Sequence, residues 1–335
     1  MQIFEPHYYR QFTCLAGSCP DSCCKEWEVE IDKDSAAYYR GLPGALGQRL
    51  REVMRDDAQW GTVMTIENGR CPMWRDDGLC RIQAELGHDA LCKTCRDFPR
   101  LCHDYGSFQE LGLELSCPEA ARLILSAENK PHLVKDAPGG DAPDYDEDAM
   151  AVLLETRSAA LALIGNMNFS VPQMLTLLLY FGYQAQSLLD GEDTPTFDAR
   201  AILESAPSFA QPGGENEILA FFAELEVLTP QWQAQLTAHH SPIPWSSAFR
   251  NLARYFVERY WLQAVSDYDI VSRAKLAVIS CIAIHLAGGD LQRTAQLYSK
   301  EIENSDENVE SILDAAYSHS ALTDQKLLGM LGQNQ

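Results

Sequence analysis

Basic side chains are scarce in this sequence. It has 26 lysines and arginines against 48 aspartates and glutamates, and the formal net charge of its 335 residues is −22. Nucleic acids and anionic membranes bind proteins through basic patches, so this charge argues against both as partners. Residues 1–130 carry 15 basic and 21 acidic side chains, whereas residues 131–335 carry 11 and 27. The acidic second part can attract a basic or lysine-bearing partner.

Long apolar runs are also missing. No run reaches the length of about 18 residues that a membrane span needs, and the nearest, MLTLLLYFGY at 174–183, lies between two glutamines. The first residues, MQIFEPHYYRQF, lack the basic and apolar regions of a secretory signal. We therefore expect a cytoplasmic protein without a membrane span.

Cysteine is nearly absent from the last two thirds of the chain. Of 11 cysteines, only Cys281 lies beyond Cys117. A reducing cytosol does not maintain disulfides, and a bridge between the neighbours Cys23 and Cys24 would strain the backbone. Thiolates from several short loops suit zinc or an iron–sulfur cluster, and the remaining alternative is buried thiols that act as small apolar residues. Cys281, on an apolar helical stretch, fits that alternative.

The spacing of the thiols favours metal. CLAGSCPDSCC contains CxxxCC, and LCKTCRDFPRLC (91–102) contains CxxC, in segments marked by Gly, Pro and Asp. Arg96 and Arg100 follow the CxxC, where they either offset the charge of a cluster, bind the anionic group of a ligand, or pair with Asp97 and Asp104. Cys117 precedes a proline at a favoured first helical position, so we expect it at a helix N-terminus, where the dipole favours a thiolate.

Periodicity predicts few strands and many helices. Residues 1–13 are expected to form a short segment that leads into the first cysteine loop. A strand is expected at 25–32, where Trp27, Val29 and Ile31 alternate with Glu26, Glu28 and Glu30, and others at 61–66 and 107–115. Helices are predicted at 34–58 with a break at GLPG (41–44), at 80–88, from Pro118, and at 148–165, 171–189, 215–228, 231–239, 246–266, 270–287, 290–303 and 306–319, with a polar insert at 190–214.

These patterns indicate a mainly α protein with a few short strands. The acidic Pro- and Gly-containing segment 130–148 is the best boundary. We expect a Cys-rich, metal- or iron–sulfur-binding domain at 1–130 and an acidic, mostly helical domain at 131–335.

The first third resembles the flagellin lysine N-methylase family. The resemblance lies in YYRQFTCLAGSCPDSCCKEWEVEID (8–32), CPMWRDDGLCRIQAELG (71–87), CKTCRDFPR (92–100) and ELSCPEAARLIL (114–125). The chain is also similar to small cysteine-rich proteins described as zinc- or iron-chelating. The helical remainder fits the family only in length and character.

The resemblance implies a protein-lysine N-methyltransferase that uses S-adenosylmethionine, acts on flagellin and carries an iron–sulfur cluster, with 4Fe–4S as the expected type and zinc as the alternative. The family's recurring cysteines fall on Cys14, Cys19, Cys23, Cys24, Cys71, Cys80, Cys95 and Cys117. Cys92, Cys102 and Cys281 lie outside that pattern. One [4Fe–4S] cluster takes four thiolates, so either some of the eight are structural or a second metal is present.

Methylation needs a neutral lysine amine, although lysine is protonated near neutral pH. Glu119, Asp97 and Tyr105 are weak candidates to accept the proton, and Arg96 and Arg100 are weak candidates for cofactor binding. The sequence has no Gly-rich strand–loop–helix for a nucleotide and no CxxxCxxC triplet. The methyl-donor site is thus implied by the resemblance alone.

Two other functions remain open. One is a non-enzymatic zinc- or iron-binding module with a chelating, electron-transfer or interaction role, which the missing nucleotide loop favours. The other is a thiol redox enzyme that uses Cys92 and Cys95, although CKTC lacks the strand-then-helix setting typical of such sites. The sequence does not indicate an oligomeric state.

Overall fold

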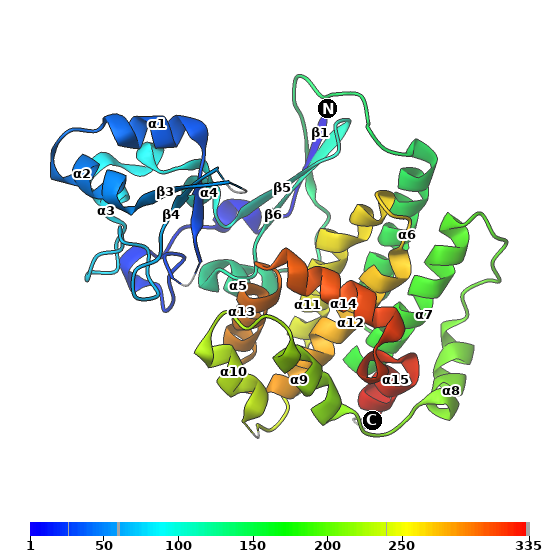
Figure 1. Ribbon diagram of the computed structural model, residues 1–335. Coiled ribbons are helices and arrows are strands. Elements are labelled where there is room, and N and C mark those ends of the chain that lie inside the picture. The colour runs from blue at the N-terminus through cyan, green and yellow to red at the C-terminus, as the bar shows by residue number, and fades with distance from the viewer. Residues whose placement is uncertain (26, 59–60, 239, 333–335) are drawn as a thin grey trace.

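A computed structural model describes residues 1–25, 27–58, 61–238 and 240–332. This part of the chain contains 15 α-helices and seven short β-strands. The prediction of a mainly α protein with a few short strands is confirmed. The cysteine-rich part (residues 14–97) lies beside a larger helical body (residues 147–332) (Figure 1). The two meet near α5 (Pro118–Leu125) and α13 (Leu291–Ile302).

The first sheet joins distant segments. Its order is β5 (Arg100–Asp104), β6 (Phe108–Leu113), β1 (Gln2–Glu5) and β7 (Leu133–Asp136). β1 runs parallel to β6 and antiparallel to β7. Residues 1–13 therefore contain an inner strand rather than a simple lead-in, and the expected boundary segment contributes an edge strand. Each is four residues long, too short for a clear alternation in sequence.

The second sheet belongs to the cysteine-rich part. Its order is β2 (Val29–Ile31), β4 (Gly61–Met64) and β3 (Met54–Asp57), with antiparallel pairing throughout. Each of the predicted strands at 25–32 and 61–66 is present in a shorter form, with Val29 and Ile31 buried and Trp27 ahead of β2. Glu26 lies outside the described residues.

Four short helices complete the cysteine-rich part. They are α1 (Lys33–Gly41), α2 (Gly44–Val53), α3 (Arg81–Leu86) and α4 (Lys93–Asp97). The break expected at GLPG is present, since Pro43 is the N-cap of α2 and Gly44 has φ 76°. The predicted helix at 34–58 is wrong beyond Val53, because Met54–Asp57 form β3 and pair with β4 instead. Gly87 ends α3 with φ 90°, a conformation that favours glycine.

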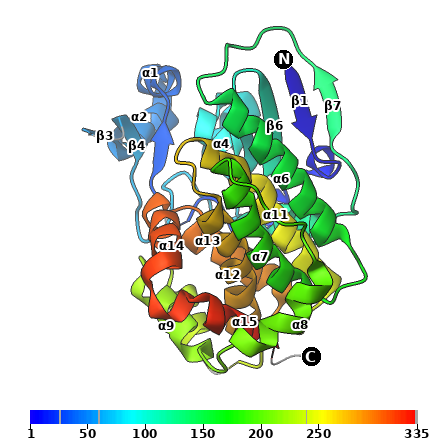
Figure 2. The same ribbon diagram turned by 90° about the vertical axis from the view of Figure 1, so that its right-hand side faces the viewer.

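The helical body surrounds α12 (Ile270–Ala287), all of whose residues are buried. Helices α7, α9, α11, α13, α14 and α15 pack against it (Figure 2). The remaining bounds are α6 (Glu147–Gly165), α7 (Val171–Leu189), α8 (Ala199–Phe209), α9 (Glu215–Glu224), α10 (Pro230–Thr237), α11 (Ser247–Tyr260), α14 (Asp306–Ser318) and α15 (Asp324–Gly332).

The predicted helices of the second part are all present, and two helices were not predicted. α8 lies inside the expected polar insert and includes Pro207, which disguises it in the sequence. α15 ends the described chain. Both pack against α7, so tertiary contacts stabilise them.

One described helix, α12, is long and apolar enough to cross a membrane, with a mean hydropathy of 1.7. Its whole surface is buried in the protein, and Arg273 and Lys275 on it pair with Asp267 and Asp324. This packing makes α12 the core helix of the helical body.

Buried apolar residues form two cores. The smaller draws on residues 29–92, with Tyr39, Leu50 and Met73 at its centre. The larger joins residues such as Phe12, Phe108 and Leu115 to the helical body. The first sheet and α5 therefore pack with the helices, while the boundary at 130/131 stays a prediction.

Candidate functional site

A cavity of about 370 Å³ lies where the cysteine-rich part meets the helical body. Its lining comes from residues 12–27, 78–83, 88–100 and 116–119, and from α13 and the residues after it, through Lys300 and Asn304. The surface is mostly apolar, with Phe12, Trp27 and Phe98 among the lining side chains. The site is thus shared by segments from both ends of the chain.

Seven of the eight predicted metal-ligating cysteines line this cavity. They are Cys14, Cys19, Cys23, Cys24, Cys80, Cys95 and Cys117. The eighth, Cys71, does not line the cavity but contacts the thiol of Cys24, which does. Cys102 is exposed on β5 and Cys281 is buried in α12, and neither lines the cavity.

Cys92 lies closer to the site than its sequence indicated. It is the N-cap of α4, and its thiol contacts that of Cys95, which lines the cavity. Because one turn of helix separates the two residues, the CxxC spacing brings their thiols together. Cys92 is therefore a candidate ligand that the family pattern omitted.

Glycines allow the cysteine loops to approach one another. A Cβ on Gly17 would lie 3.1 Å from the carbonyl oxygen of Asp77, and a Cβ on Gly78 would lie 3.4 Å from the Cα of Gly17. Gly78 also has φ 79°. The turn before Cys80 can therefore pack directly on the loop that carries Cys14 and Cys19.

Several of the thiols contact one another. Cys23 contacts Cys24, Cys24 contacts Cys71, and Cys92 contacts Cys95. Burial raises the pKa of Cys117 to about 12, with further contributions from Cys19 and Cys14.

The sequence predicted that Cys117 lies at a helix N-terminus, which favours its thiolate form. Cys117 is the N-cap of α5, as predicted, and the backbone N–H groups of Glu119 and Ala120 lower its pKa. Burial outweighs that effect in the protein alone. A thiolate here therefore needs a positive partner such as a metal ion.

The donor chemistry fits a soft metal or a sulfur cluster, because thiolates from separate loops surround one cavity. Within residues 1–25, 27–58, 61–238 and 240–332, however, no three His, Cys, Asp or Glu side chains converge closely enough to hold a single ion. The iron–sulfur and zinc assignments therefore stay predictions.

The flagellar biosynthetic protein FliU of Salmonella muenchen is 32% identical over 130 residues, which are 37% of this chain and 77% of FliU. The chain belongs to the flagellin lysine N-methylase family. The lysine-N-methylases of Salmonella typhimurium (strain LT2) and Salmonella choleraesuis (strain SC-B67) are also 32% identical over 130 residues, but the match covers 32% of each. No family model and no solved structure match.

The two arginines expected near the site of this family member both line the cavity. The Nε atom of Arg96 lies 3.8 Å from a carboxylate oxygen of Asp97. Arg100 places its guanidinium 5.1 Å from the centre of the Phe12 ring. Arg96 thus lies near Asp97, which agrees with the alternative that these arginines pair with acidic residues. Arg100 lies over the aromatic ring of Phe12.

The three candidate proton acceptors occupy different places. Glu119 lines the cavity and accepts two hydrogen bonds from Arg122, which keep the pKa of its carboxyl below the usual value. Asp97 lies on α4, outside the residues that line the cavity. Tyr105 lines a separate open groove of about 1000 Å³, and burial raises the pKa of its phenol. Of the three, only Glu119 combines a place at the cavity with an ionised carboxylate.

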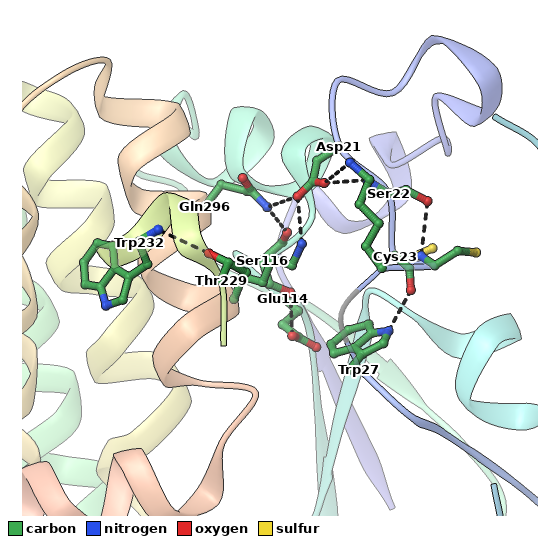
Figure 3. A network of polar contacts seen from close by, with 12 residues as sticks. Asp21, Ser22, Cys23, Trp27, Glu114, Ser116, Thr229, Trp232 and Gln296 are labelled. Carbon is green, nitrogen blue, oxygen red and sulfur yellow. Dashed lines mark hydrogen bonds and ion pairs between the residues drawn. The ribbon is translucent and has the colours of Figure 1, made fainter. Parts of the chain in front are cut away.

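Sequence reasoning did not identify the polar wall of the cavity. Asp21, in the first cysteine loop, contacts Gln296 of α13 (Figure 3). It also contacts Lys300 of the same helix. The amide nitrogen Nδ2 of Asn304 is buried and has no hydrogen-bond partner among the described residues. Only the tertiary structure unites residues separated by more than 270 positions, so no local sequence signal could have revealed this wall.

Proposed function

We propose that the protein is an S-adenosylmethionine-dependent protein-lysine N-methyltransferase that acts on flagellin and holds an iron–sulfur cluster in the cysteine-lined cavity. The observation that carries the proposal is that seven family cysteines from four chain segments line one cavity. Two relatives at 32% identity are named lysine-N-methylases. The site lies in a chain that we expect in the cytoplasm, where thiols stay reduced.

More cysteines line the cavity than one cluster needs as ligands. A [4Fe–4S] cluster binds four thiolates, and we propose that its ligands come from the group around Cys23, Cys24, Cys80 and Cys95. Bound there, the cluster would supply an iron centre that fixes the cysteine loops. Arg96 and Arg100 on the cavity wall would offset its negative charge.

The transfer itself breaks the bond between the methyl carbon and the sulfonium sulfur and forms a bond between that carbon and the lysine nitrogen. The lysine must first lose a proton to expose its electron pair, and the Glu119 carboxylate at the cavity is the acceptor that we propose. Glu119 is ionised at the cavity and can attract the lysine ammonium before that loss. The raised pKa of Tyr105 keeps its phenol protonated, which makes it a poor acceptor.

The decisive test uses anaerobically purified full-length protein, flagellin and a methyl donor labelled in its methyl group. We expect label on flagellin lysines together with iron and sulfide in the protein. Cys80→Ser and Cys95→Ser should lose both metal and activity, whereas Cys102→Ser, an exposed thiol outside the cavity, should keep both. Absence of label from a preparation whose cluster is intact would overturn the methyltransferase assignment.

A second candidate is a non-enzymatic zinc- or iron-binding module. It is favoured by the absence of a Gly-rich nucleotide loop from the sequence and by a match that spans only 37% of the chain. A colourless protein with tightly held zinc and no methyl transfer would support this function. The thiol redox alternative requires Cys92, so a fully active Cys92→Ala variant would eliminate it.

A further inference from the structure

The loop that carries the first four cysteines has little regular structure of its own. Between Cys14 and Cys24 the backbone forms only a short 3₁₀ turn, Ala16–Ser18. Such a segment holds side chains in a defined place only when contacts from elsewhere fix it. Asp21, which lies between Cys19 and Cys23, provides these contacts.

The two carboxylate oxygens of Asp21 face different parts of the protein. Oδ1 accepts hydrogen bonds from the backbone N–H of Ser22 at 2.8 Å and from Nζ of Lys25 at 3.4 Å. Oδ2 accepts from Nε2 of Gln296 and from Nζ of Lys300, both at 3.2 Å. One side chain therefore organises the loop locally and ties it to α13, as Figure 3 shows for Asp21, Ser22 and Gln296.

The partners on α13 are held independently of the loop. Gln296 and Lys300 are four residues apart and so share one face of the helix. Their exposed fractions are 7% and 8%. α13 packs against α5, α10, α12 and α14, so the helical body fixes the surface to which Asp21 binds.

Gln296 also contacts a second cysteine-bearing segment. Nε2 of Gln296 also donates to the backbone carbonyl of Ser116 at 2.7 Å, directly before Cys117. Gln296 thereby joins the loop of Cys19 and Cys23 to the segment of Cys117. Asp21, Ser116, Cys117 and Lys300 all line the cavity, which places this junction at the cavity wall.

We infer that Asp21 is a positioning residue, which holds the first cysteine loop against α13 so that its thiols face the cavity. The inference deepens the proposed function, because it assigns the helical body a direct part in shaping the metal centre. The Asp21–Lys300 ion pair is mostly buried, with side-chain exposures of 24% and 11%. Loss of one charge from such a pair weakens the contact strongly.

Asp21→Asn tests the inference, since it keeps the size of the side chain and removes its charge. Lys300→Met and Gln296→Leu remove the partners from the other side. Glu28→Gln is the matched control, because Glu28 forms a 2.8 Å ion pair with Arg55 in the cysteine-rich part and neither residue lines the cavity. The full-length proteins are compared by iron release to a chelator, by mass-spectrometric alkylation of Cys14, Cys19, Cys23 and Cys24, and by far-UV circular dichroism.

We expect Asp21→Asn to release iron about tenfold faster or more, since groups that hold metal ligands in place are worth about 10–100-fold in metal affinity. Alkylation of the loop cysteines should accelerate, while the helical signal stays at the wild-type level. Lys300→Met and Gln296→Leu should change the same two readouts, and Glu28→Gln neither. If Asp21→Asn releases iron and reacts with the alkylating agent as slowly as Glu28→Gln, the inference is wrong.

Failure of the proposed metal centre and failure of the role assigned to Asp21 give different results in these experiments. If the wild-type protein holds no metal, the proposed centre fails, and the alkylation rates alone decide whether Asp21 positions the loop. If Asp21→Asn does not fold, Lys300→Met and Gln296→Leu carry the test. Wild-type rates in both of these variants would then overturn the inference.

Discussion

Asp32 shows at the scale of one residue how the cysteine-rich part is joined. It is the N-cap of α1, where one carboxylate oxygen accepts a hydrogen bond from the backbone N–H of Ser35 at 3.0 Å. The other oxygen accepts from the N–H of Lys93 at 2.8 Å, within the CxxC segment. These bonds, the one from Lys93 first, lower the pKa of Asp32 from 3.8 to about 2.

Asp32→Ala should lower the free energy of unfolding at pH 7 by about 1–2 kcal/mol, because a lost N-cap costs that amount. A carboxylate whose pKa is lower in the folded state stabilises the protein above its unfolded pKa, and this contribution is lost as the pH falls. The difference between the variant and the wild type should therefore shrink between pH 3.8 and about 2.

Chemical denaturation across this pH range measures the effect of Asp32. Asp34→Ala, in the first turn of the same helix, serves as the control, with an expected change of about 0.5 kcal/mol. A loss for Asp32→Ala that stays constant down to pH 2 would contradict the assigned role.

At the scale of elements, the helical body depends on the close approach of α7 and α12. Gly182 of α7 is buried against Ala274 of α12, and a Cβ added at Gly182 would lie 2.4 Å from the Cβ of Ala274. Backbone and side-chain shifts would have to relieve that overlap. The absence of a side chain at Gly182 thus sets the distance between the two helices.

Gly182→Ala should reduce the free energy of unfolding by about 1–3 kcal/mol through overpacking, although alanine favours helix over glycine by about 1 kcal/mol. Urea denaturation followed by circular dichroism gives the net change. Gly332→Ala in α15 is the control, because a Cβ there meets no atom of the described residues within 4 Å. Equal or greater stability of Gly182→Ala would show that the helices separate without cost.

At the scale of the whole molecule, the two cores differ greatly in size. Among the residues that the structure describes, 13 buried residues form the core of the cysteine-rich part, whereas the other core extends through the helical body. A small apolar core gives little stability by itself, and bound metal commonly provides the rest. The centre proposed for the cavity would therefore act as the main support of the smaller part.

Removal of metal with a chelator should loosen the cysteine-rich part before the helical body. Limited proteolysis is expected to cut within residues 14–95, while far-UV circular dichroism retains most of its helical signal. Protein desalted without chelator is the control. Equal protease resistance of the two preparations would show that the smaller core is stable without metal.

Patterns over a few neighbouring residues in the sequence were enough to predict many of the strands and helices. The alternation around Val29 and Ile31 gave β2, Pro118 marked the start of α5, and three-and-four spacing gave most helices of the second part. The unequal use of cysteine pointed to the segments that line the cavity. These signals act over a few residues, so a single sequence contains them.

Only the tertiary structure decided which distant segments meet. It paired β1 with β6 and β7 and placed Asp21 on Gln296 and Lys300. It also stabilised α8, which a proline hides in the sequence. Such contacts depend on the packing of surfaces that are far apart along the chain, and no local periodicity encodes which surface another will meet.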